Sequence, residues 1–117
     1  MATYRIFRAG ALEAQGTGLD DPLAEAGVDG AVGWLDVAPE ELPAVADRLG
    51  FHHHAVEDAV KRADVGSEIA QRTKLDRFPG HIFLYLFRSG LDADGQLRLR
   101  ELPVFARTDL IVTVDRA

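Results

Sequence analysis

The chain has 117 residues, the size of one domain with one hydrophobic core. Its charged fraction of 27% and hydrophobic fraction of 47% are typical of a folded, soluble globular protein. A formal net charge of -6 argues against nucleic-acid binding, which depends mainly on cations set against phosphates. The absence of cysteine excludes disulfides and thiolate metal sites, and the longest apolar run, Ile82–Phe87, is too short to cross a bilayer.

Two strands are predicted in the first third of the chain. Thr3–Arg8 alternates and carries aromatic and branched residues, and Ala31–Val37 is typical of a buried strand, with Trp34 expected in the core. Between them, Ala9–Asp29 is small, acidic and rich in glycine. This composition predicts an irregular segment with a short helix over Pro22–Ala26.

Two helices are predicted next. Pro39 suits the first position of a helix and Gly50 suits its end. The apolar residues between them recur on one helical face, at Leu42, Val45, Ala46 and Leu49. A second helix is expected to begin near His53 or His54, with an apolar face made of Ala55, Val56, Ala59, Val60 and Ala63. Val65–Ala70 is ambiguous, because its glycine interrupts the helical pattern.

A hairpin is predicted in the C-terminal half. Thr73–Phe78 and His81–Phe87 are expected to be strands joined by a tight turn at Pro79-Gly80, with Phe78 in the core. The second strand has no alternation, so we expect both of its faces to be covered.

The remaining residues predict two more strands. Leu91–Gly95 is expected to be a loop and Leu97–Arg100 a half-exposed strand, while Pro103 indicates an edge or a bulge. Val104–Ala106 and Leu110–Val114 flank a connection of hairpin length. The predicted fold class is therefore α/β (α+β), a single domain over residues 1–117 with one mixed sheet and helices packed on it.

Glu57 and Asp58 are the first candidate functional residues. Mg²⁺ takes oxygen ligands, keeps several waters and often uses only one or two carboxylates. An adjacent acidic pair on an exposed helix turn suits such a site, particularly if another chain adds a carboxylate. The alternative is structural: each carboxylate precedes a cation by four residues, Lys61 and Arg62, so the pairs would stabilise the helix by only about 0.3–0.5 kcal/mol each.

Other motifs point less clearly to chemistry. His52, His53 and His54 are suitable ligand types for a transition metal, but consecutive residues on a helix do not converge, which favours a structural turn. Asp92-Ala93-Asp94-Gly95 lacks the downstream ligands of a calcium loop and is expected to be a plain turn. No nucleophile elbow, P-loop lysine or HExxH motif is present, so we expect no enzymatic activity.

An ordered set of motifs from Trp34 to the C-terminus resembles the N-terminal cytosolic domain of the CorA family of magnesium and cobalt transporters. The motifs are Trp34-Leu35-Asp36, Pro39 with Glu40-Glu41-Leu42, Leu49-Gly50-Phe51-His52, Ala55-Val56-Glu57-Asp58-Ala59, Gln71-Arg72-Thr73-Lys74-Leu75-Asp76-Arg77-Phe78, His81-Ile82-Phe83-Leu84 and Leu110-Ile111-Val112-Thr113-Val114. No single motif is specific to the family, whereas their order and spacing together are.

The resemblance implies a mixed sheet sandwiched between helices and set on a helical stalk, followed by two membrane helices. It also implies a homopentamer whose channel is held shut by Mg²⁺ bound between neighbouring cytosolic domains. Carried over by position, the sensing carboxylate is Asp58, with Glu57 as a secondary ligand and a partner carboxylate from the neighbouring subunit's stalk. We expect weak Mg²⁺ binding here, with Co²⁺ as a second cation, and no transport by these residues alone.

The stalk, the membrane spans and the Gly-Met-Asn pore signature are not among these residues. We therefore expect either an excised domain, at the cytoplasmic face of the inner membrane in the full-length protein, or a stand-alone interaction module with the same fold. The chain also departs from the family pattern. The family usually has His-Pro-Leu at His52–His54 and a proline at Thr73, and Ala63–Ala70 is an apparent insertion beside the acidic pair.

Overall fold

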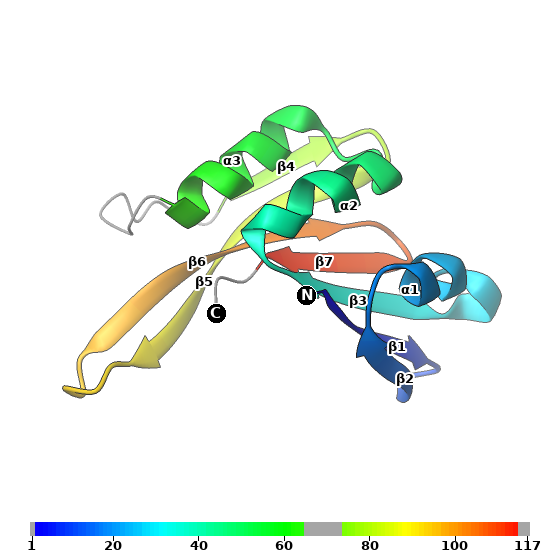
Figure 1. Ribbon diagram of the computed structural model, residues 1–117, viewed down its shortest axis with the longest axis horizontal. Coiled ribbons are helices and arrows are strands. Elements are labelled where there is room, and N and C mark those ends of the chain that lie inside the picture. Colours follow the sequence, from blue (N-terminus) through cyan, green and yellow to red (C-terminus); the bar gives the residue numbers. More distant parts are fainter. Residues whose placement is uncertain (1, 65–73, 115–117) are drawn as a thin grey trace.

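The structure is a computed structural model that describes residues 2–64 and 74–114. A seven-stranded sheet in the order β2-β1-β3-β7-β6-β5-β4 carries helices on one face (Figure 1). The strands are β1 (Thr3–Arg8), β2 (Ala11–Thr17), β3 (Val32–Val37), β4 (Lys74–Phe78), β5 (His81–Leu91), β6 (Leu97–Ala106) and β7 (Leu110–Val114). The helices are α1 (Asp20–Glu25), α2 (Leu42–Leu49) and α3 (His53–Asp64), with 3₁₀ turns η1 (Val28–Gly30) and η2 (Pro39–Glu41).

The central pair of strands makes the sheet mixed. β3 and β7 are parallel, with Leu35 opposite Val112, whereas β1 pairs antiparallel with β3 and β6 pairs antiparallel with β7. The chain reaches β7 only after passing through both long helices and three further strands. The mixed sheet with packed helices confirms the predicted α/β (α+β) class.

The N-terminal hairpin corrects one prediction. Ala11–Thr17, expected to be irregular, is the edge strand β2, which pairs antiparallel with β1. A two-residue turn joins the strands, and both of its residues, Ala9 (φ 51°) and Gly10 (φ 80°), are left-handed, as a hairpin turn of this kind requires. β2 was missed because it is almost entirely exposed and so has no hydrophobic alternation. The short helix was expected at nearly the right place and begins slightly earlier, at Asp20.

The first long helix begins and ends where the sequence indicates. Pro39 opens the 3₁₀ turn η2, and the Glu41 carboxylate accepts a hydrogen bond from the Ala38 N–H at 3.0 Å. The chain continues into α2, which ends at Gly50 in the left-handed conformation (φ 71°), with its N–H donating to the Ala46 carbonyl at 2.7 Å. This left-handed residue turns the chain back toward α3.

Replacing Gly50 by alanine should destabilise the protein by about 1–2 kcal/mol, because a side chain makes the left-handed conformation costly. Gly90→Ala is the matched control, since Gly90 lacks a positive φ and a Cβ there would meet nothing within 4 Å. We expect Gly90→Ala to change the free energy of unfolding by no more than about 0.5 kcal/mol. Urea unfolding followed by circular dichroism measures the stability of both variants. Equal losses would contradict the left-handed conformation of Gly50.

The core lies between the helices and one face of the sheet. Its buried residues include Leu35, Val37, Leu42, Val45, Ala55, Ala59, Phe83, Tyr85, Phe105, Leu110, Val112 and Val114. Leu42, Val45 and Ala46 are buried in α2, and Ala55 and Ala59 in α3, as the apolar spacing predicts, while Val56 and Val60 are partly buried. α1 covers the same face. Gly33 on β3 lies beneath it: a Cβ added to Gly33 would be 2.9 Å from the Leu110 side chain and 3.6 Å from Ala26, the residue that ends α1.

The opposite face of the sheet corrects two further predictions. Side chains alternate along β3, so Leu35 and Val37 are buried while Trp34, expected in the core, is 39% exposed. Along β5, Phe83 and Tyr85 are buried on the helix side, whereas Leu86 on the other side is exposed. The expectation that both faces of this strand are covered is therefore wrong, because the described helices cover only one. Phe78, by contrast, packs against the core.

β5 and β6 extend beyond the sheet as a two-stranded arm (Figure 1). β5 continues to Leu91, past the predicted end at Phe87, and its ladder with β6 runs from Ile82–Ala106 pairing to Leu91–Leu97 pairing. β6 pairs with β7 only from Val104 onward. Pro103, where an edge or a bulge was expected, therefore pairs with β5 alone, and β6 has a strand on both sides from the next residue on. Leu97–Arg100, predicted to be a half-exposed strand, lies in this arm. Leu97 is exposed there, since no further strand or helix lies against the arm in the described structure.

The predicted hairpins at Pro79-Gly80 and at Arg107–Asp109 are both present, with Gly80 left-handed (φ 82°) and the Arg107 N–H donating to the Leu110 carbonyl at 2.8 Å. The predictions for Val65–Ala70, and for Thr73 as the start of β4, lie outside the described residues. Among the helices of the described residues, none has the length and apolar character needed to cross a bilayer.

Candidate functional site

The acidic pair lies on α3, in the helical layer above the sheet. Helix α3 buries Ala55 and Ala59, and the Glu57 side chain is exposed on its outer side. Asp58 is the next residue on the same helix. The geometry leaves the Glu57 carboxylate available to solvent or to another chain.

The histidines form a stack at the start of α3 rather than a convergent ligand set. The rings of His52, His53 and His54 lie 4.2–5.2 Å apart, centroid to centroid, and His52 also stacks on Phe78 at 4.6 Å. His81, the first residue of β5, packs against Phe51 at 5.1 Å and against Phe78 at the same distance, ring centroid to ring centroid. Within residues 2–64 and 74–114, no three histidine, aspartate or glutamate side chains group closely enough to hold a metal ion.

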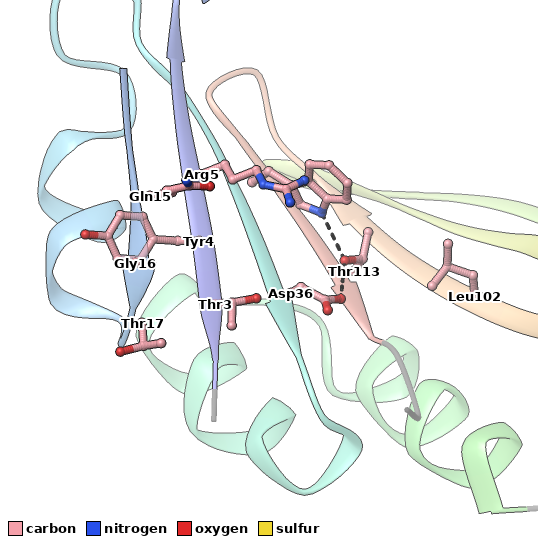
Figure 2. A pocket seen from close by; sticks show the side chains of 10 residues that line it. Thr3, Tyr4, Arg5, Gln15, Gly16, Thr17, Asp36, Leu102 and Thr113 are labelled. Atoms are coloured by element: carbon pink, nitrogen blue, oxygen red, sulfur yellow. Dashed lines mark hydrogen bonds between the residues drawn. The ribbon is translucent and has the colours of Figure 1, made fainter. Parts of the chain in front are cut away.

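An open pocket lies on the sheet face that the described helices leave uncovered (Figure 2). Its volume is about 760 Å³, and its lining includes Arg5, Gln15, Trp34, Asp36, Leu102 and Thr113. It spans β1, β2, β3, β6 and β7, so strands that are distant in sequence build it together. The sequence pattern does not predict this pocket, because Trp34 is expected in the core. Strict alternation from the buried Leu35 and Val37 would have placed Trp34 and Asp36 together on the other face.

A chain of hydrogen bonds crosses this pocket between two parallel strands. The Trp34 indole Nε1–H donates to the Thr113 hydroxyl at 3.0 Å, and that hydroxyl donates to Asp36 Oδ1 at 2.6 Å (Figure 2). The Arg5 guanidinium lies 5.4 Å from the centroid of the Trp34 ring, within range of a cation–π interaction. These contacts fix the indole and the carboxylate relative to each other.

The aspartate loop that resembles the start of a calcium site is a turn, as predicted. Asp92 Oδ1 accepts hydrogen bonds from the N–H groups of Asp94 and Gln96, each at 2.9 Å. Asp92 Oδ2 pairs with Arg98 at 2.8 Å. The Gln96 N–H, the Arg98 guanidinium and the Asp94 N–H together lower the pKa of Asp92, against a smaller opposing effect of burial. The Asp92 carboxylate thus stabilises the turn that joins β5 to β6 at the end of the arm.

No protein-family model matches the sequence, and no curated protein is significantly similar to it.

Proposed function

We propose that this chain is the regulatory, divalent-cation-sensing domain of a CorA-type magnesium and cobalt transporter. In this proposal, neighbouring copies of a homopentamer share Mg²⁺ through the carboxylates of Asp58 and Glu57. The bound ion favours the closed assembly, and its loss shifts the population toward the open one. The domain senses the ion, and the membrane part of the full-length protein conducts it.

The observation that carries the proposal is the position of the acidic pair. The pair lies in the outer helical layer, on a helix whose opposite side is buried, and the Glu57 side chain is exposed. A carboxylate shared between subunits must be accessible from outside the domain. A buried Glu57 would have contradicted the proposal.

The uncovered face of the sheet is a second source of support. Its exposed apolar side chains are Val32, Trp34, Leu75, Leu86 and Ile111. Soluble monomers rarely expose large contiguous apolar patches, so such a face suits a further covering layer. The resemblance implies helices on both faces of the sheet, and the described helices supply one of these layers.

The same face favours a second candidate, a stand-alone interaction module that uses it to bind a partner. The coding sequence that follows Ala117 separates the two candidates. A continuing helix, two apolar spans and a Gly-Met-Asn signature would support the transporter domain, whereas a stop codon would support the module.

Titration of the ¹⁵N-labelled chain with Mg²⁺ tests the site. We expect the backbone amides of residues 57–61 to shift first, with an affinity of about millimolar or weaker, because a site of one or two carboxylates lacks its partner ligand. Asp58→Asn should abolish these shifts. Asp47→Asn, on the exposed side of α2, should leave them unchanged. Shifts centred elsewhere, with residues 57–61 silent, would refute the assignment.

Comparing Mg²⁺ with Co²⁺ separates the acidic pair from the histidine stack. Mg²⁺ prefers oxygen ligands, whereas Co²⁺ also binds imidazole. We therefore expect Mg²⁺ to leave the amides of His52–His54 unperturbed. If Asp58 serves the shared ion rather than the fold, Asp58→Ala should change the free energy of unfolding by less than about 1 kcal/mol. A larger loss would mean that the residue has a structural role.

A further inference from the structure

The turn between α2 and α3 is held by two imidazole nitrogens that accept backbone hydrogen bonds. Nε2 of His81, the first residue of β5, accepts from the His52 N–H at 3.2 Å. Nδ1 of His52 accepts in turn from the His54 N–H at 3.2 Å, within the first turn of α3. We call this pair of bonds, made by His81 and His52, the histidine relay. It connects the sheet to the beginning of α3.

The relay requires a neutral ring at His81. A neutral imidazole has one donor and one acceptor nitrogen, whereas the protonated ring is a donor at both. The His81 ring also hydrogen-bonds to the backbone of Pro79. With Nε2 accepting from His52, the network assigns the proton to Nδ1. Protonation of Nε2 would set two N–H groups against each other and break the bond to His52.

The surroundings of His81 oppose its protonation. The residue is only 7% exposed, and its ring packs between Phe51, Phe78 and Phe105, with centroid distances of 5.1–6.3 Å. Burial lowers its pKa, the Pro79 hydrogen bond raises it, and the nearby His52 lowers it again.

Within the part of the chain that the structure describes, few titratable groups lie near this ring. The connection before α3 contributes His52, whose ring stacks with those of His53 and His54 at the start of α3. Strand β4 carries Asp76 on its helix-side face, two residues from Phe78. β6 presents the apolar ring of Phe105. His52 adds repulsion to a proton on His81, and Asp76 is the carboxylate on the adjoining strand.

We propose that the histidine relay is a proton-responsive joint. Neutral His81 holds the start of α3 on the sheet, and its protonation releases the His52 N–H and loosens the first turn of α3. This goes beyond cation sensing. One consequence, a coupling of pH to cation binding by Glu57 and Asp58 on the same helix, rests on the proposed function, but the joint does not.

The direction of the pH effect follows from linkage. Because folding lowers the pKa of His81 from its ordinary value of 6.5, the unfolded chain takes up the proton first as the pH falls. The stabilisation from this group is complete above about pH 6.5 and is lost as the pH falls toward the folded-state pKa. In the loosened state the ring is released and takes its ordinary pKa. Below both pKa values, the population of that state therefore exceeds its value at neutral pH by about tenfold for each unit that separates them.

The ring nitrogens of the metal-free, 117-residue chain provide the direct test. In ¹⁵N–¹H correlation spectra at about pH 7.5, we expect the Nδ1-protonated tautomer at His81. On acidification, the amide signals of His52 and His54 should shift together with the His81 ring, at a midpoint below about 6.5. An Nε2-protonated tautomer at neutral pH, or a His52 amide that stays silent while His81 titrates, would overturn the proposal.

Glutamine at position 81 keeps an acceptor oxygen but does not titrate. In the wild type, acidification from about pH 7 to 5 should accelerate amide hydrogen exchange at the start of α3 relative to the intrinsic exchange rate at each pH, and His81→Gln should lose this acceleration. His53→Gln changes an exposed ring and should keep the wild-type pH profile. Unchanged acceleration in His81→Gln would overturn the proposal. If that variant does not fold, the wild-type tautomer measurement still decides.

Discussion

Replacing Phe105 by alanine should lower the free energy of unfolding by about 3–5 kcal/mol, the usual cost of removing a large buried aromatic side chain. Phe105 lies on β6 and is fully buried, at 0% exposure. Its ring stacks on Phe51 at 4.5 Å and tilts against Phe83 at 4.6 Å. It therefore joins the turn between the two long helices to the middle of the sheet.

A loss of this size is a large part of the total stability of about 5–15 kcal/mol that is typical of a domain. Urea unfolding should show a lower midpoint with an unchanged slope, as expected when stability changes without a change in the denatured state. Leu91→Ala, at a side chain that is 74% exposed on the β5–β6 arm, is the control and should cost no more than about 0.5 kcal/mol. A Phe105→Ala variant within about 1 kcal/mol of wild type would contradict the described core.

Replacing Thr113 by valine should cost about 1–3 kcal/mol, because it leaves two polar groups without their partner. Valine has nearly the same shape but lacks the hydroxyl that accepts from Trp34 Nε1 at 3.0 Å and donates to Asp36 at 2.6 Å. Thr113 is 7% exposed, so water can replace these bonds only in part. Thr113→Ser keeps the hydroxyl and should retain most of the stability.

The indole reports on the same change directly. Trp34 is the single tryptophan of the chain, so its fluorescence comes from this pocket alone. We expect Thr113→Val to shift the emission maximum and Thr113→Ser to leave it close to wild type. Unchanged emission and stability in the valine variant would mean that the hydrogen bonds across the pocket contribute nothing.

Local signals predicted most of the secondary structure. The start at Pro39, the end at Gly50 and the apolar spacing of α2 are all present, because capping and helical periodicity act over a few neighbouring residues. The paired strands β4 and β5 were predictable for the same reason, through the Pro79-Gly80 turn. β2 was not, since an edge strand exposed on both faces lacks a hydrophobic pattern.

Of the candidate site, the sequence alone indicated the acidic pair on a helix, and the structure adds that Glu57 is exposed there. Neither the pocket of Trp34, Asp36 and Thr113 nor the histidine relay could be predicted, because each joins residues separated by roughly 30 to 80 positions. Local propensity thus determined the helices, the turns and most strands from the amino-acid order. Which face of the sheet is covered, and which side chains meet across it, depends on strand order and register, and only packing between distant segments decides these.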